Sequence, residues 1–177
     1  MMSTHLFPIP GPWRGHLSVV PRPRGGDWLE DEAKGWRRNG IDVVVSLLEP
    51  EEAAQLDLLD ESDAAETYGM QFISFPIPDR GVPASTPAAL AVLSEIADAL
   101  DRGKSVAVHC RQSIGRAGLI AAGVLIASGT SPEKALDTVS SARGLTVPET
   151  SGQREWIERL RPQTVLFSPN GEPAHRP

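Results

Sequence analysis

The chain has 177 residues, of which 40% are apolar and 23% charged, and its formal net charge is −6. That length suits one domain that can bury a hydrophobic core. The negative balance argues against nucleic acid as a partner, because binding to a phosphate backbone needs a dense basic surface. The longest apolar run, 119–127, is about half of the roughly 18 residues that span a bilayer. We therefore expect no membrane partner and, without an export signal at the N-terminus, a cytoplasmic protein.

Strand-like and helix-like segments alternate along the sequence. The nearly continuous β-branched run 41–48 is typical of a strand covered on both faces, and the apolar spacing in 87–100 predicts a helix. In chain order the pattern predicts a flexible arm (1–12), a strand (17–20), a helix that Asp27 caps (27–38), a strand (41–48), a helix (49–67), a strand (70–75), a proline-rich loop (76–87), a helix (87–100), a strand (105–109), a loop (110–116), and helices at 117–128, 131–143 and 150–161 before a flexible tail (162–177). This alternation predicts one α/β domain, 13–161, with a central, mainly parallel sheet of four to five strands flanked by helices.

A cysteine stands where one of these strands ends and an apolar helix follows. Cys110 is the only cysteine, and Arg116 comes after five intervening residues. Ligands of open α/β sheets bind beyond the carboxyl ends of the strands, and the free N–H groups of a helix N-terminus can bind an anion. A guanidinium can grip two phosphate oxygens, and the same positive field favours a reactive thiolate. The phosphate-binding loop would then comprise Arg111, Gln112, Ser113, Ile114, Gly115 and Arg116.

A second loop carries a candidate proton donor. Displacing an oxygen leaving group from phosphorus needs an acid on the far side of the phosphate. Asp79 follows the strand 70–75 in a loop held by prolines at positions 76, 78 and 83, and Gly81 lets that loop bend. Alternatively, Asp79 forms only an Asx turn, and Cys110 and Arg116 are a buried thiol and a surface charge. Asp27 or Glu49 would be the proton donor in place of Asp79 if the loops come together in a different arrangement around Cys110.

The stretch His-Cys-x5-Arg from His109 to Arg116, with the upstream Pro-Asp loop, resembles the protein-tyrosine-phosphatase superfamily. The likeness is strongest to dual-specificity-like and kinase-associated-phosphatase-like enzymes of bacteria, whose sequences the segments 21–29 and 143–153 also resemble. The resemblance implies the fold of dual-specificity phosphatases. It also implies hydrolysis of a phosphorylated protein or small phosphomonoester, with phosphotyrosine as the main substrate and dual specificity as a variant.

The resemblance further implies a role for each site residue. Cys110 attacks phosphorus and forms a cysteinyl-phosphate, Arg116 binds the phosphate, and Asp79 protonates the leaving group and then activates water. His109 orients the loop and tunes the thiol, and Gln153 positions the water. No metal and no organic cofactor are implied, and the chain's other histidines lack ligand spacing.

Two positions depart from the pattern of the superfamily. Ala117 stands where such loops carry Ser or Thr, whose hydroxyl bonds the departing thiolate, and Ser113 replaces a common Gly. The departures leave open a second hypothesis, a phosphate-binding module with weak turnover. An arsenate reductase or sulfurtransferase is a third, but arsenate reduction usually needs further thiols, and a sulfurtransferase loop normally differs in length.

Overall fold

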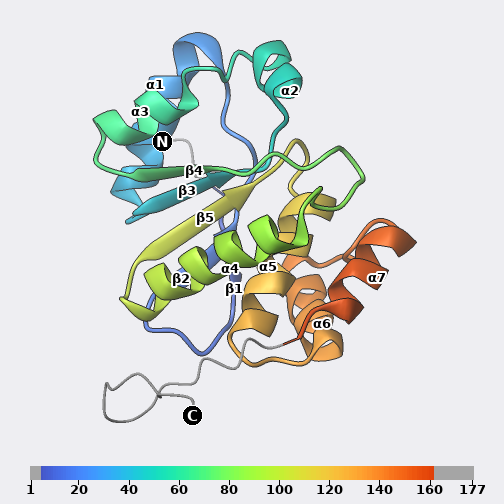
Figure 1. Ribbon diagram of the computed structural model, residues 1–177. Helices are drawn as coiled ribbons and strands as arrows, with labels where there is room; N and C mark the ends of the chain where they lie inside the picture. Colours follow the sequence, from blue (N-terminus) through green and yellow to red (C-terminus); the bar gives the residue numbers. More distant parts are fainter. Residues whose placement is uncertain (1–4, 162–177) are drawn as a thin grey trace, which may run out of the picture.

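The computed structural model describes residues 5–161, in which five strands form one central sheet between two layers of helices (Figure 1). The strands are β1 (Phe7–Ile9), β2 (His16–Val19), β3 (Val43–Ser46), β4 (Gln71–Ser74) and β5 (Ser105–His109). Their order in the sheet is β1-β2-β5-β3-β4, and every neighbouring pair is parallel except β1 and β2. The predicted α/β fold with a mainly parallel sheet is therefore confirmed.

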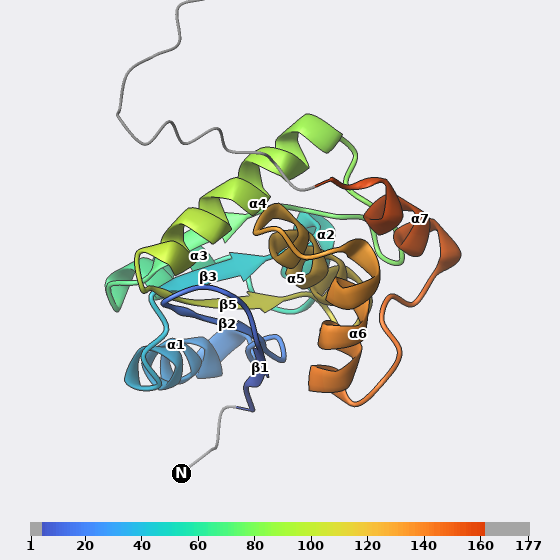
Figure 2. The ribbon, with the colours of Figure 1, turned by 90° about the horizontal axis from the view of Figure 1, so that it is seen from below.

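Helices cover both faces of this sheet, as Figure 2 shows from below. The helical elements are η1 (Gly26–Trp28), α1 (Leu29–Arg38), α2 (Pro50–Gln55), α3 (Glu61–Thr67), α4 (Thr86–Asp101), α5 (Gly115–Ala127), α6 (Pro132–Arg143) and α7 (Ser151–Arg159). One face is packed by α1 and α3, and the other by α4, α5, α6 and α7, while α2 lies beyond the carboxyl ends of the strands (Figure 1). Among the helices described between residues 5 and 161, none is long and apolar enough to cross a bilayer.

The central strand β5 lies between β2 and β3 and is buried on both faces. Val106 and Val108 pack into the core on the α5 side, whereas Ala107 packs into the core beside α1 and α3. Successive side chains of a strand point to opposite faces. This alternation determines which layer receives the side chain of each residue at the carboxyl end of β5.

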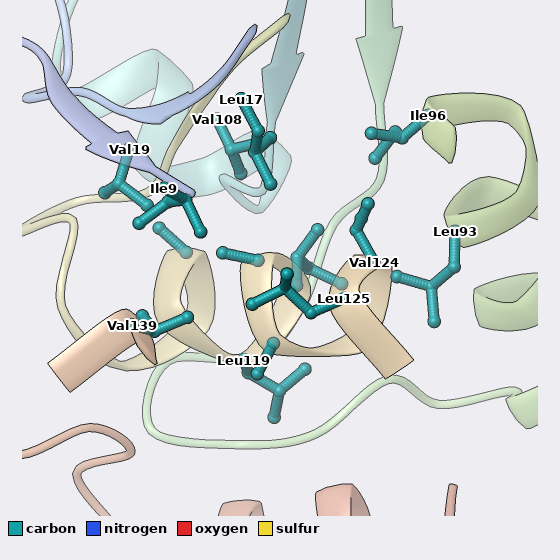
Figure 3. Close-up of a cluster of buried hydrophobic side chains, with 14 of the residues drawn as sticks. Ile9, Leu17, Val19, Leu93, Ile96, Val108, Leu119, Val124, Leu125 and Val139 are labelled. Carbon is teal, nitrogen blue, oxygen red and sulfur yellow. The ribbon is translucent and has the colours of Figure 1, made fainter. Parts of the chain in front are cut away.

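Helix α5, which follows β5, packs against other parts of the molecule on every side. Every residue of α5 from Gly115 to Ile126 is buried, as expected for a helix that is apolar all round. In Figure 3 its residues Leu119, Val124 and Leu125 lie among side chains of the sheet, of α4 and of α6. Burial of one such side chain contributes about 1.5–3 kcal/mol, so this packing holds the N-terminus of α5 firmly in place.

Two local expectations differ from the structure. The predicted helix 49–67 is two helices, α2 and α3, separated by a turn in which Asp57 adopts a φ of +53°. No Gly or Pro marks this turn in the sequence. Asp27 does not cap α1, since it lies inside η1 and α1 begins after Trp28 without a side-chain cap.

The expected N-terminal arm also contains structure. Residues Phe7–Ile9 form the edge strand β1, and Ile9 belongs to the main core. The strand pairs antiparallel with β2, so part of this segment is tied to the sheet. The predicted tail, 162–177, lies outside the described residues, as do residues 1–4.

Candidate active site

The loop between β5 and α5 curls around the sulfur of Cys110. The side chain of Cys110 is buried, and the backbone N–H of Ser113 donates to its Sγ at 3.1 Å. Ser113 itself has a φ of +55°, a conformation that suits glycine better than serine. Its buried hydroxyl donates to the carbonyl of Val20, the residue after β2, which fixes this conformation. The loop is thereby joined to the neighbouring strand.

The side chain of Arg116, in the first turn of α5, is held by a carboxylate that the sequence analysis missed. Its Nη1 and Nη2 donate to the two carboxylate oxygens of Glu52 at 2.6 and 2.9 Å, and Nη1 also donates to the carbonyl of Ile77 at 2.9 Å. Burial opposes the charge of Arg116, but the hydrogen bonds to Glu52 and the charges of Cys110, Glu52 and Asp79 outweigh it and raise the pKa of the guanidinium. The guanidinium plane is therefore fixed at two edges.

Glu52 lies in α2, directly after the carboxyl end of β3. The hydrogen bonds from Arg116 lower the pKa of Glu52 most, against the effect of burial, and the backbone N–H of Glu49 adds a further bond at 3.0 Å. Glu49 and Glu52 also form a capping box at the start of α2. The acidic residues there are typical of a helix N-terminus, so the sequence pattern alone favours a capping role. Only the position of Glu52 in the chain could have indicated its contact with Arg116. Glu52 follows β3, and β3 ends at the same edge of the sheet as β5.

Asp79 lies in the loop that follows β4. The residue occupies a tight turn that the N–H of Gly81 closes with a 2.8 Å hydrogen bond to the carbonyl of Pro78. One carboxylate oxygen of Asp79 lies 3.3 Å from Nη2 of Arg116, while 63% of the side chain remains exposed. The structure thus brings Asp79 to the guanidinium of the Cys loop, and it leaves the rivals Asp27 and Glu49 without such a contact among the interactions of residues 5–161.

The buried side chain of Gln153 connects three parts of the site. Its Nε2 donates to the carbonyl of Gly81 in the Asp79 loop at 3.0 Å, and its Oε1 accepts from the N–H of Glu149 at 3.2 Å. A Cβ added to Gly115 would collide with the carboxylate of Glu149 and come within 3.2 Å of Nε2. A side chain at position 115 would therefore require the carboxylate of Glu149 to move away from the start of α5.

His109 lies behind the Cys loop and is fully buried. Its Nε2 and Oε1 of Glu61, from α3, are 2.6 Å apart, and its ring lies 6.0 Å from that of Trp36 in α1. The sequence analysis missed Glu61, because the predicted continuous helix 49–67 gave no reason to turn this carboxyl inward.

The remaining residues of the loop face outward or support it. Arg111 and Gln112 are exposed, and Nη1 of Arg111 lies 3.4 Å from Oε1 of Gln55. Ile114 precedes α5, and its carbonyl accepts from the N–H of Gly118. Arg143 of α6 donates through Nε to the carbonyl of Ser113 at 3.1 Å. Burial lowers the pKa of Arg143, and the charge of Cys110 opposes this effect.

Comparison with known proteins assigns this arrangement to a family. More than half of the chain, residues 20–130, matches the family model described as "Polymorphic toxin system, DSP-PTPase phosphatase". The chain belongs to this DSP-PTPase family. The predicted membership in the protein-tyrosine-phosphatase superfamily, on its dual-specificity side, is thereby confirmed.

Two curated relatives show how much of a known protein this DSP-PTPase family member resembles. The chain is 23% identical over 141 residues to Cyclin-dependent kinase inhibitor 3 of Rattus norvegicus, which covers 78% of this chain and 66% of the rat protein. It is 33% identical over 149 residues to Protein tyrosine phosphatase domain-containing protein 1 of Mus musculus, over 77% of this chain and 20% of the mouse protein. The chain thus spans just under two thirds of the first relative and a fifth of the second.

Solved structures show the same fold. Kinase associated phosphatase, determined with a serine in place of its catalytic-site cysteine, superposes with a TM-score of 0.79 at 18% identity, over 89% of this chain and 93% of that chain. The active form of Tk-PTP superposes with a TM-score of 0.67 at 30% identity, over 82% and 94%. The fold is therefore shared with proteins of 18% and 30% sequence identity.

Proposed function

We propose that this DSP-PTPase family member hydrolyses phosphomonoesters, with phosphotyrosine in proteins as the main substrate, through a cysteinyl-phosphate intermediate. The observation that carries the proposal is the convergence of three groups on one loop. Cys110 receives a hydrogen bond from the N–H of Ser113, and Arg116 lies in the helix turn that this loop enters. Asp79, from a different loop, lies 3.3 Å from the guanidinium of Arg116.

In the first step the thiolate of Cys110 attacks phosphorus, an S–P bond forms, and the bond from phosphorus to the ester oxygen breaks. Asp79 gives its proton to that oxygen, so the alcohol or phenol leaves neutral. The guanidinium of Arg116 and the N–H groups of the loop stabilise the negative charge on the phosphoryl oxygens in the transition state. No cofactor takes part in this chemistry.

In the second step a water molecule attacks phosphorus and the S–P bond breaks. The Asp79 carboxylate takes the proton of the water, inorganic phosphate forms, and Cys110 leaves as thiolate. We assign to Gln153 the orientation of this water or of the Asp79 loop, since its amide bonds the carbonyl of Gly81. His109 orients the strand end that carries Cys110.

A second candidate function is a phosphate-binding module with slow turnover. One observation favours it, namely the fully buried Ala117 directly after Arg116, which offers no hydroxyl to the departing thiolate. Such a module keeps the anion site and forms the cysteinyl-phosphate, but it releases phosphate slowly.

Hydrolysis of an aryl phosphate by the wild type and by Cys110→Ser tests the proposal. We expect the variant to lose activity while it still binds vanadate, because a serine hydroxyl ionises far less readily than a thiol. Ser141→Ala, at an exposed position of α6, is the matched control and should keep activity. Near-normal hydrolysis by Cys110→Ser would exclude the cysteine mechanism, and a wild type that binds vanadate without turnover would favour the binding module.

A further inference from the structure

The backbone of Ser113, in the middle of the Cys loop, has a conformation that residues with a side chain usually avoid. Its φ is +55°, and between residues 5 and 161 the other non-glycine residues with a positive φ are Asp57 and Arg80. Both of these are exposed, whereas Ser113 is buried. The left-handed conformation lowers the population of such a residue roughly five- to thirtyfold. The surroundings of Ser113 must therefore offset this cost.

Three hydrogen bonds hold Ser113 in this conformation. Its hydroxyl donates to the carbonyl of Val20, and its N–H donates to Sγ of Cys110 at 3.1 Å. Its carbonyl accepts from Nε of Arg143 at 3.1 Å, and the guanidinium carbon of Arg143 lies 3.8 Å from the ring centre of Phe7 in β1. Only the bond to Val20 depends on the side chain of Ser113, because the other two use its backbone.

The carbonyl of Val20 is available because the pairing of two strands ends just before it. Strand β2 pairs with β5 from His16 to Val19, so Val20 lies beyond the last paired residue, and it is fully buried. A buried carbonyl needs a donor, and the hydroxyl of Ser113 supplies one. The same hydrogen bond thus satisfies the end of β2 and restrains the Cys loop.

We propose that Ser113 is a positioning residue of the phosphate site: its hydroxyl stabilises a backbone conformation that otherwise suits glycine. Before any ligand binds, the loop is then held with the N–H of Ser113 directed at Cys110. The affinity for a ligand falls with the fraction of molecules whose site is competent, so this restraint strengthens the binding of an anion. The inference rests on the proposed role of the Cys loop as the phosphate site.

Two substitutions separate the hydroxyl from the backbone conformation. Ser113→Ala removes the hydroxyl and keeps Cβ, so the cost of the positive φ is no longer offset. Ser113→Gly removes the hydroxyl and this cost together, because glycine adopts positive and negative φ about equally well. If Ser113 only filled space, glycine would do more damage than alanine, since it removes more atoms and adds backbone freedom. The proposal predicts the opposite order.

Titration calorimetry with vanadate measures the affinity of the loop. We expect Ser113→Ala to bind vanadate roughly tenfold more weakly than the wild type, and Ser113→Gly to bind at least about threefold more tightly than Ser113→Ala. Both variants should be less stable in urea, because both leave the carbonyl of Val20 without the hydroxyl. Ser18→Ala, which removes a buried hydroxyl from β2 itself, is the matched control and should keep the wild-type affinity.

Wild-type affinity in Ser113→Ala, or an affinity of Ser113→Gly no higher than that of Ser113→Ala, would overturn the proposal. If Ser113→Ala fails to fold, NMR of the ligand-free wild-type chain decides. A positive φ brings the amide and α hydrogens of residue 113 close together and gives a strong cross-peak between them, whereas a weak cross-peak would overturn the proposal. Vanadate binding needs no turnover, so the expected order of affinities in a chain that hydrolyses no phosphate ester would count against the proposed function alone.

Discussion

At the scale of single residues, the two-point contact between Arg116 and Glu52 determines how the guanidinium is presented. Both terminal nitrogens are already oriented by carboxylate oxygens at 2.6 and 2.9 Å. A side chain fixed in this way loses little further conformational freedom when it binds a phosphate. The guanidinium of Arg116 is therefore already oriented before a phosphate binds.

Arg116→Lys should lower kcat/KM for an aryl phosphate by about 100-fold or more, because an ammonium lacks the planar fork and cannot bond Glu52 at two points. Steady-state kinetics with a range of substrate concentrations checks this. The matched control is Arg154→Lys on the surface of α7, where the native arginine pairs only loosely with Glu158 at 3.9 Å. An Arg116→Lys variant with the activity of the control would place Arg116 outside the site.

Ala117 leads to a prediction about the second chemical step. A hydrogen bond to a charged group contributes roughly 1.5–3 kcal/mol, so the missing hydroxyl should slow the expulsion of the thiolate by about ten- to a hundredfold. Rapid mixing with an activated aryl phosphate should therefore give a burst of product near one equivalent per site, followed by a slower steady rate. Ala117→Ser should raise the steady rate and shrink the burst. If neither the burst nor the gain is observed, another donor, such as the backbone N–H of Ser113, replaces the hydroxyl.

At the scale of elements, the Asp79 loop is fastened at both ends while its tip is exposed. At the near end, Ile77 is buried, its N–H donates to the carbonyl of Leu47, and its own carbonyl accepts from Arg116. At the far end, the carbonyl of Gly81 accepts from Gln153. These attachments hold the acid near the guanidinium without burying it.

Asp79→Asn should slow the hydrolysis of aryl phosphates with poor leaving groups by about 10²–10⁴-fold, and that of activated ones much less, because good leaving groups need little protonation. The dependence of kcat on leaving-group basicity measures this directly. Asp101→Asn, at the exposed end of α4, is the matched control. Equal slowing of all substrates by Asp79→Asn would indicate that Asp79 has a structural role only.

Gln153→Ala should release the far end of the Asp79 loop. The variant removes two side-chain hydrogen bonds, of which the one to the carbonyl of Gly81 holds the loop. The loss of this bond, about 1 kcal/mol, predicts a fall in kcat of roughly fivefold, again larger for poor leaving groups. Alkylation of Cys110 should stay unchanged, because Gln153 bonds neither the sulfur nor His109. A change in alkylation with normal leaving-group dependence would assign Gln153 to the Cys loop instead.

Elements whose sequence patterns lie within a few neighbouring residues could be predicted, and contacts that depend on distant parts of the chain could not. The strand β5 was predicted with its observed bounds, and α5 within two residues, because a short β-branched run and a continuous apolar helix carry strong patterns. The Cys loop was recognisable because its residues are contiguous. Glu61 was missed because its inward orientation depends on the turn at Asp57, whose positive φ no local signal announces. Glu52 was missed because an acidic residue in the first turn of a helix is typical of capping.

At the scale of the whole molecule, the free energy of unfolding depends on pH. The cause is that some carboxyl groups have a lower pKa in the folded chain than in the unfolded chain. The pKa of Glu52 is lowered from 4.5, chiefly by Arg116. The unfolded chain therefore binds this proton more readily than the folded chain. The stabilisation from Glu52 is complete above its unfolded pKa and is lost as the pH falls through the lower, folded value.

The free energy of unfolding in urea should accordingly fall as the pH drops below about 4.5, and Glu52→Gln should make this fall shallower. At neutral pH the same variant should lose about 3 kcal/mol, since it leaves Arg116 buried without its counter-charge. Glu155→Gln on α7 is the matched control, because the native side chain is exposed. An unaltered slope in Glu52→Gln would show that other carboxyls dominate the acid transition.

The order of strands in the sheet also constrains when the protein can become active during its synthesis. Strand β5 fills the gap between β2 and β3, pairing Leu17 and Val43 with Val106. A nascent chain therefore has two separate halves of a sheet until residue 109 has left the ribosome, and Cys110, the proposed nucleophile, directly follows the strand that joins them. Chains truncated before Ser105 should be digested rapidly by protease, whereas the full chain resists. If the proposed function holds, this topology prevents dephosphorylation by an unfinished chain without an inhibitor.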